Sequence, residues 1–137
     1  MIKKELFRLK KETLMIKGIG TDFLYFDTII PLVENPQDPF VQKAFTPAEQ
    51  ALILGREYPL ACYATRYAGK EAVFKALGTN GDALRFDEIE ILATADGAPV
   101  VTLLGNAKKI AEEKGITEVL LSLSYEKDCA IAYAIAQ

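Results

Sequence analysis

The sequence contains no histidine and no tryptophan, only two cysteines, and no long apolar run. The absence of histidine excludes an imidazole general base, a Ser-His-Asp triad and a zinc site with histidine ligands. Any catalysis must therefore use carboxylates, lysine, tyrosine or cysteine, or a hard cation such as Mg²⁺.

The two cysteines, Cys62 and Cys129, stand among Ala, Tyr and Ile in apolar periodic segments. A free cysteine in such surroundings behaves as a small hydrophobic residue, so we expect two buried free thiols. No stretch of about 18 apolar residues is available to span a membrane, and the N-terminus lacks the apolar block of a signal peptide. We therefore expect a cytoplasmic protein with no membrane partner.

What the chain does have is the length and composition of one ordinary domain. Its 137 residues are 50% hydrophobic and 26% charged, so we expect residues 1–137 to form a single domain. The net charge of -3 gives no overall basic surface, and we expect no nucleic acid partner. The charge is uneven, because residues 1–17 carry six bases and two acids. We interpret residues 1–13 as a basic N-terminal extension.

Capping residues predict three helices. Thr46 and Glu49 form the pattern of a capping box, which starts a short helix that ends near Gly55. An alanine-rich segment predicts the longest helix of the chain, over 59–77. Asn106 is expected to cap a third helix.

Alternating and apolar segments predict an antiparallel sheet. One apolar strand is expected to begin near Leu14, and a hairpin turn is expected at Asp96-Gly97. Small alanines alternate with bulky residues in the last strand, which indicates a strand packed on both sides. The expected fold class is α+β, with one antiparallel-dominated sheet packed against one long helix. The remaining strands are expected at 88–91, 100–104, 119–124 and 130–136.

Three motifs hold residues that could carry chemistry. Asp22 follows two glycines in Gly18-Ile19-Gly20-Thr21-Asp22, and we expect its carboxylate to be exposed at the end of a strand. Glu71 and Lys75 are spaced i, i+4 and share a helix face. Ser122 and Ser124 point to one side of a strand. Each motif alone also has a structural explanation: a turn former, a solvated ion pair, and hydroxyl groups that face water.

Taken in order, these segments resemble the holo-acyl-carrier-protein synthase family of 4'-phosphopantetheinyl transferases. The resemblance spans residues 15–137. Its most specific part is Lys70-Glu71-Ala72-x-x-Lys75, in a helix that ends Ala76-Leu77-Gly78-Thr79. The other matching segments are Gly18-Ile19-Gly20-Thr21-Asp22, Gly97-Ala98-Pro99 and Leu121-Ser122-Leu123-Ser124.

The resemblance implies a 4'-phosphopantetheinyl transferase-like fold and a Mg²⁺-dependent reaction. In that reaction, 4'-phosphopantetheine moves from coenzyme A to a serine of apo-acyl carrier protein, and 3',5'-ADP is released. Asp22 and Glu71 are implied as Mg²⁺ ligands and, together with Lys75, as catalytic residues. Short members of the family form homotrimers with the site between subunits. Coenzyme A is expected to contact Arg66, Lys70, Lys75, Gly78, Thr79, Pro99 and Ser122.

The physical chemistry of this reaction agrees with the composition. Mg²⁺ in proteins takes one or two carboxylates together with phosphate oxygens and water. Phosphoryl transfer asks the protein mainly for positioning and charge neutralisation, so a chain without histidine can catalyse it.

The sequence departs from the family's pattern in two places. Leu120 and Tyr125 stand where relatives commonly have histidines. The resemblance implies that a histidine at position 120 contacts the 3'-phosphate of coenzyme A, and leucine cannot form this bond. Unless Arg66, Lys70 or a base from a neighbouring subunit compensates, we expect weak discrimination between coenzyme A and dephospho-coenzyme A. Relatives also carry arginines that dock the acidic carrier protein, whereas residues 23–55 hold a single base, Lys43, and four acids. We expect the basic N-terminus to take over this docking.

Two other hypotheses remain open at the level of sequence. A non-catalytic module of the same fold would bind coenzyme A or a carrier protein without Mg²⁺-dependent release of 3',5'-ADP. An assembly protein would use Asp22, Glu71 and Lys75 only structurally. Incubation with coenzyme A, Mg²⁺ and apo carrier proteins separates these hypotheses from an active transferase.

Overall fold

A computed structural model of the chain describes residues 2–5, 15–79 and 82–137. Most of the basic N-terminal extension therefore lies outside the described residues. Within the described part, no helix is long and apolar enough to span a bilayer.

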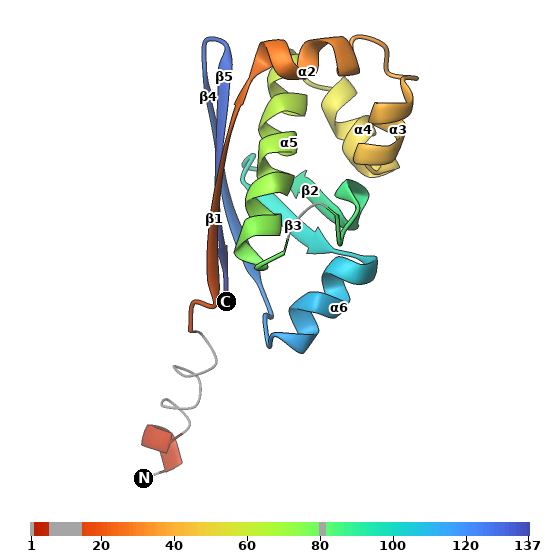
Figure 1. Ribbon diagram of the computed structural model, residues 1–137. Helices are drawn as coiled ribbons and strands as arrows, with labels where there is room; N and C mark the ends of the chain where they lie inside the picture. Colours follow the sequence, from red (N-terminus) through yellow and green to blue (C-terminus); the bar gives the residue numbers. More distant parts are fainter. Residues whose placement is uncertain (1, 6–14, 80–81) are drawn as a thin grey trace.

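The described strands form two antiparallel sheets (Figure 1). The larger sheet has the order β1-β5-β4, so the C-terminal strand lies between the other two. The smaller sheet pairs β2 with β3. The expected α+β class is confirmed, although the strands divide between two sheets instead of one. The strands are β1 (Gly18–Tyr25), β2 (Ile89–Ala93), β3 (Pro99–Leu103), β4 (Val119–Glu126) and β5 (Cys129–Ala136).

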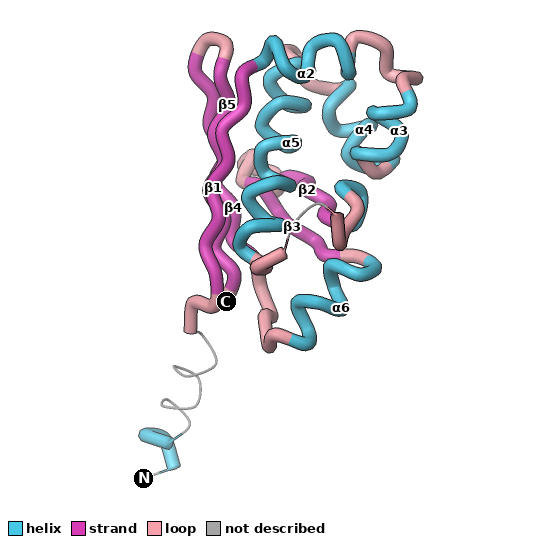
Figure 2. The backbone as a smooth tube through the Cα atoms, in the orientation of Figure 1, coloured by secondary structure: helices cyan, strands magenta, loops and turns pink. Residues whose placement is uncertain are grey.

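The long helix α5 (Pro59–Ala76) lies across the larger sheet and is the centre of the domain (Figure 1). Its bounds agree with the prediction of 59–77 to within a residue. The tube in Figure 2 shows three shorter helices, α2, α3 and α4, gathered at one end of α5, and a fourth, α6, beyond its other end. The shorter helices are α2 (Phe26–Val33), α3 (Pro39–Ala44), α4 (Pro47–Leu54) and α6 (Gly105–Glu113).

Small residues let α5 approach the sheet closely. The four alanines of β5 that face the helix are buried, and they leave room for its backbone. On β1 the approach is closer still, because a Cβ added at Gly20 would lie 1.9 Å from the carbonyl oxygen of Ala72. Any side chain at Gly20 would push strand and helix apart. The glycines before Asp22 therefore set the distance between β1 and α5.

The opposite face of the larger sheet is apolar and exposed. The expectation that β5 is packed on both sides is wrong for a single chain, since Ile131 and Tyr133 are both nearly half exposed. The alternation of alanines with bulky residues in β5 correctly separates the two faces of the sheet. In a single chain, however, only the alanine face is covered, by α5. We call this surface the outer sheet face. Its most exposed large residues are Ile19, Phe23, Tyr25, Leu120, Ile131 and Tyr133, between 45% and 58% exposed.

The capping box is present as predicted. The Thr46 hydroxyl accepts from the Glu49 amide at 3.2 Å, and Oε1 of Glu49 accepts from the Thr46 amide at 2.9 Å. The prediction for Asn106 is wrong, because α6 begins at Gly105 and its N-cap residue, Leu104, has no capping side chain. A carboxylate oxygen of Glu88 accepts from the amide of Ala107 instead, at 2.9 Å. A negative charge from a neighbouring turn thus replaces the expected cap.

Two further expectations need correction. The first strand begins at Gly18 and not near Leu14, which lies outside the described residues, so Asp22 stands in the middle of β1 and not at its end. Both cysteines are free, but only Cys62 is buried, while Cys129 is partly buried at the start of β5. The hairpin turn at Asp96-Gly97 is confirmed between β2 and β3, with Gly97 at a φ of +88°.

Candidate active site

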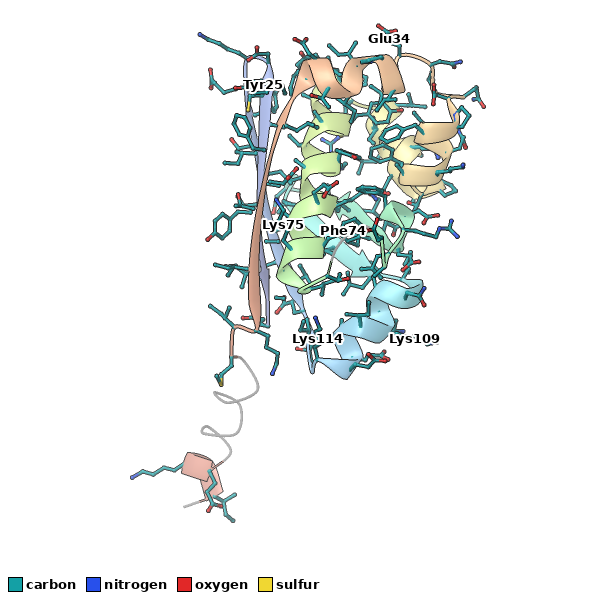
Figure 3. The ribbon with its side chains drawn as sticks, in the orientation of Figure 1. Tyr25, Glu34, Phe74, Lys75, Lys109 and Lys114 are labelled. Carbon is teal, nitrogen blue, oxygen red and sulfur yellow. The ribbon has the colours of Figure 1, made fainter. Side chains whose placement is uncertain are left out.

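Asp22 and Lys75 meet where β1 crosses the second half of α5. Asp22 is paired with Ala132 in the sheet and lies on the face that packs on the helix. The ammonium of Lys75 lies 3.2 Å from Oδ1 of Asp22 and donates to the carbonyl oxygen of Thr21 at 2.8 Å. Figure 3 shows Lys75 on α5 beside the sheet. The Asp22 carboxylate is only 19% exposed, while Lys75 is 54% exposed and open to a ligand.

Glu71 lies one turn before Lys75 and belongs to the same site. Burial raises the pKa of Glu71 above its usual range, and the charge of Asp22 raises it further, while Lys75 opposes both effects. Burial raises the pKa of Tyr67, one turn earlier on α5, and the charges of Glu71 and Asp22 raise it further. Two carboxylates, one ammonium and one phenol therefore share one partly open surface.

This pair of carboxylates fits Mg²⁺. The charge of Asp22 raises the proton affinity of Glu71, and a divalent cation relieves such a repulsion. Hard carboxylate oxygens are the ligands that Mg²⁺ prefers. Among the described residues, no three side chains of His, Cys, Asp or Glu gather into a ready-made metal site. A cation held by Asp22 and Glu71 would need its other ligands from water or from the phosphates of a substrate.

Lys70 occupies a different place from the one the resemblance implies. Its side chain is fully buried, and its ammonium donates to Oε1 of Glu49 at 2.8 Å. It also donates to the carbonyl oxygens of Phe86 at 2.9 Å and Ile89 at 2.5 Å. All three N–H donors are used inside the protein. Lys70 therefore has no donor left for coenzyme A and faces away from the carboxylate pair.

The partner of Lys70, Glu49, is the hub of a buried network. Its Oε1 also accepts from the amide of Thr46, and its Oε2 accepts from the amide of Ile91 at 2.9 Å. The network joins α4, α5 and β2. The capping-box motif located Glu49 in the sequence, but it carried no signal of the lysine 21 residues further on.

Arg66 lines a polar hollow of about 580 Å³ on the same helix, nearer its N-terminal end. Its Nε donates to the carbonyl oxygen of Ile91 at 3.2 Å, and burial lowers its pKa. Arg56 lines the same hollow and was not recognised in the sequence. Tyr125 also lines it, whereas Leu120 lies on the outer sheet face. Relatives commonly have histidines at positions 120 and 125. Of these two, only Tyr125 lines the same hollow as Arg56 and Arg66.

The remaining expected residues are dispersed. Gly78 and Thr79 come just after Leu77, the C-cap residue of α5, and Gly78 lies beside Lys75 at a second basic hollow. Pro99 begins β3, and Ser122 is exposed on the outer sheet face opposite Tyr133. The structure thus brings together Asp22, Glu71, Lys75 and Gly78, and separates Arg66, Lys70, Pro99 and Ser122 from them within one chain.

Comparison with known proteins agrees with this geometry. Residues 18–134 match the family model of the 4'-phosphopantetheinyl transferase superfamily, and the chain belongs to this superfamily. The holo-[acyl-carrier-protein] synthase of Desulforudis audaxviator is 45% identical over 122 residues, which cover 89% of this chain and 93% of that protein.

Solved structures give the same result. The holo-[acyl-carrier-protein] synthase of Neisseria meningitidis is 35% identical, with a TM-score of 0.79, over 90% of this chain and 99% of that one. The Helicobacter pylori synthase, solved in complex with coenzyme A, is 28% identical, with a TM-score of 0.73, over 87% of this chain and 99% of that one.

Proposed function

We propose that this chain is a holo-acyl-carrier-protein synthase, which transfers 4'-phosphopantetheine from coenzyme A to a serine of an apo-acyl carrier protein. The placement of Asp22, Glu71 and Lys75 at one open surface carries the proposal, since it gathers the residues that phosphoryl transfer needs. The relatives at 34% to 45% identity are named for this activity, and a coenzyme A complex is known for a protein of the same fold.

The reaction exchanges a phosphoanhydride bond of coenzyme A for a phosphate ester bond to the carrier serine. The serine oxygen of the carrier attacks the phosphorus atom that bears the pantetheine arm, and the serine proton is released. The bond from this phosphorus to the rest of the diphosphate breaks, and 3',5'-ADP leaves. Lys75, which is exposed, holds a phosphate oxygen and offsets the charge of the transition state.

Asp22 and Glu71 are the residues that would hold Mg²⁺. When bound there, the ion neutralises the diphosphate and helps to align it for attack. Tyr67, whose pKa is raised by burial and by the charges of Glu71 and Asp22, is the aromatic residue near this site. The ring of Tyr67 stacks on Phe86 at 5.0 Å and is fixed in this position.

A homotrimer accounts for the outer sheet face. An apolar surface of this kind, with aromatic side chains about half exposed, is unusual for a monomer and typical of a subunit interface. Copies that associate through this face bring Ser122 into the interface. The Arg66 hollow of one subunit then completes the site at Asp22 and Glu71 of its neighbour. We also propose that this enzyme works in the cytoplasm.

The decisive experiment is a transfer assay. The protein is incubated with coenzyme A, Mg²⁺ and a panel of apo carrier proteins, and the mass of each carrier is measured. A mass gain of one phosphopantetheine on a serine is expected, and it should disappear when EDTA is added. Binding of coenzyme A without any mass gain on any carrier would favour the non-catalytic module.

A further inference from the structure

Three lysines surround a hollow at the C-terminal end of α5. The hollow has a volume of about 580 Å³, and Lys17, Lys75 and Lys114 contribute to its wall. They come from the segment before β1, from α5 and from the end of α6. The described residues that line the hollow include no carboxylate. We call this hollow the lysine pocket.

The lysine pocket adjoins the carboxylate pair. Lys75 belongs to both, because its ammonium is paired with Asp22 and its side chain forms part of the pocket wall. Gly78 lines the same hollow beside Lys75. The pocket is therefore placed to hold a second anionic group of the same ligand.

The Lys114 ammonium is fixed in place by the protein. It donates to the carbonyl oxygens of Leu77 and Gly78, which end α5 and carry the negative end of its dipole. Two of its three N–H donors are used in this way, and one remains for a ligand. Figure 3 shows Lys114 below the end of α5 and Lys109 nearer the middle of α6.

Lys17 is held through its backbone. Its amide donates to the carbonyl oxygen of Ala136 at 2.8 Å, which continues the pairing of β1 with β5. Its ammonium approaches the end of α6, 3.6 Å from the position that a Cβ on Gly115 would take. Lys17 and Lys114 thus hold their charges near helix C-termini, where cations are favourable.

Gly78 keeps the pocket open. It has a φ of +72°, and a Cβ at this position would lie 2.8 Å from the Lys114 ammonium. A side chain here would be strained and would displace the ammonium from its carbonyl partners. Glycine leaves both the turn and the lysine undisturbed.

We propose that the lysine pocket binds a phosphate group of coenzyme A, with Lys17 and Lys114 as binding residues beside Lys75. The inference rests on the proposed function, since it takes coenzyme A as the ligand. Phosphate is a compact dianion, and ammonium groups bind it through short charge-assisted hydrogen bonds. These two lysines supply the cations that buried Lys70 cannot provide.

Binding by calorimetry tests this inference directly. We compare the dissociation constants of coenzyme A and dephospho-coenzyme A for the wild type, Lys17→Met, Lys17→Met/Lys114→Met and the control Lys109→Met, an exposed lysine of α6 that does not line the pocket. The double variant should bind coenzyme A about tenfold more weakly or worse, which corresponds to the loss of a charged hydrogen bond. Lys109→Met should bind like the wild type.

Two comparisons separate a binding role from a structural one. Lys114→Arg keeps the charge and should keep most of the affinity for coenzyme A. Lys17→Met removes a charge without affecting the hydrogen bonds of Lys114 at the end of α5. This single variant therefore still tests the inference if the double variant does not fold. If the loss caused by Lys17→Met disappears with dephospho-coenzyme A, the pocket holds the 3'-phosphate; if it persists, the pocket holds the diphosphate.

The outcomes also separate this inference from the proposed function. Suppose that the wild type binds coenzyme A, and that both Lys17→Met and the folded double variant bind it with an affinity within twofold of the wild type. In that case the lysine pocket is not a phosphate site, and the transferase proposal stands. If the wild type binds no coenzyme A, the proposed function itself fails.

Discussion

The ammonium of Lys70 lies 2.8 Å from Oε1 of Glu49, and both side chains are fully buried. A charged pair without contact to water costs desolvation energy, which the remaining hydrogen bonds of the two groups offset. The pair connects α4 to the helix that carries Glu71 on the next residue. It therefore fixes the rotation of α5 so that Glu71 turns toward Asp22.

Removing one partner of this pair should be worse than removing both charges. Lys70→Met leaves an uncompensated buried carboxylate and is expected to lower the free energy of unfolding by about 3–5 kcal/mol. Lys70→Met/Glu49→Gln removes both charges and should recover part of that loss, measured by urea unfolding. Because Lys70 has no free donor, the folded double variant should keep its affinity for coenzyme A. A double variant less stable than Lys70→Met would contradict the argument.

Glu71→Gln should abolish Mg²⁺-dependent transfer while preserving the fold. The substitution keeps the shape of the side chain but removes one of two anionic ligands, and we expect transfer to fall at least about a hundredfold. Mg²⁺ should raise the melting temperature of the wild type and leave that of Glu71→Gln unchanged. Glu113→Gln, on the exposed side of α6, is the control for both measurements. Transfer by Glu71→Gln at the wild-type rate would remove Glu71 from the site.

The raised pKa of Glu71 predicts a pH dependence of the metal-free protein. Burial first, and then the charge of Asp22, make the folded state bind this proton more tightly than the unfolded state, whose pKa is near 4.5. The folded state is therefore favoured below the unfolded pKa and loses this contribution as the pH rises through the folded pKa. At neutral pH without Mg²⁺, Glu71→Gln should be more stable than the wild type to urea.

This difference should shrink when the pH is lowered below about 4.5, where the wild-type carboxyl group is protonated in both states. Mg²⁺ binding should also weaken as the pH falls, because the ion competes with the proton for Glu71. Equal stability of the wild type and Glu71→Gln at every pH would show that Glu71 is not electrostatically strained by Asp22.

A charge on the outer sheet face should dissociate the proposed trimer. Tyr133 lies at the centre of this face on the middle strand, and Tyr133→Glu would place a carboxylate in an apolar interface. We expect a change from trimer to monomer by light scattering, together with loss of transfer, since the proposed trimer completes the site between subunits. Tyr133→Phe is the matched control. A wild type that is monomeric at high concentration would rule out this assembly.

Deleting residues 1–11 should weaken the use of the carrier protein more than that of coenzyme A. The deletion removes five bases and one acid, and such charges attract an acidic partner in a salt-dependent way. The KM for the carrier should rise by about threefold or more at low salt, with a smaller effect at high salt. Unchanged KM values for both substrates would place carrier docking elsewhere on the protein.

The sequence predicts much of the fold because its strongest signals are local. Alanine content and a following glycine define α5, and alternation defines β4 and β5, so these elements could be placed to within about two residues. Asp22, Glu71 and Lys75 were found because their motifs are specific and their order matches a known family. The structure then showed that they share one surface.

What the sequence could not predict depends on contacts between distant residues. A lysine in a helix is normally solvated, and nothing near Lys70 indicated that Glu49 would draw it into the core. The N-terminal cap of α6 comes from Glu88, which the alternating pattern of residues 88–91 assigned to a strand and which the structure places in a short 3-10 helix, Phe86–Glu88. Lys17 and Lys114 belong to no motif, and only the fold brings them together beside Gly78.

The pairing of β1 with β5 has a consequence for how the chain is made. The Thr21 hydroxyl donates to the carbonyl oxygen of Ala132, 111 residues later, at 3.1 Å. During synthesis on the ribosome, the strand that carries Asp22 is made early and waits without its partner until the last strand emerges. Loop closure over such a separation is slow. The carboxylates proposed to hold Mg²⁺ should therefore reach their final arrangement only after β5 has emerged, so nascent chains that lack β5 should not bind Mg²⁺ at this site.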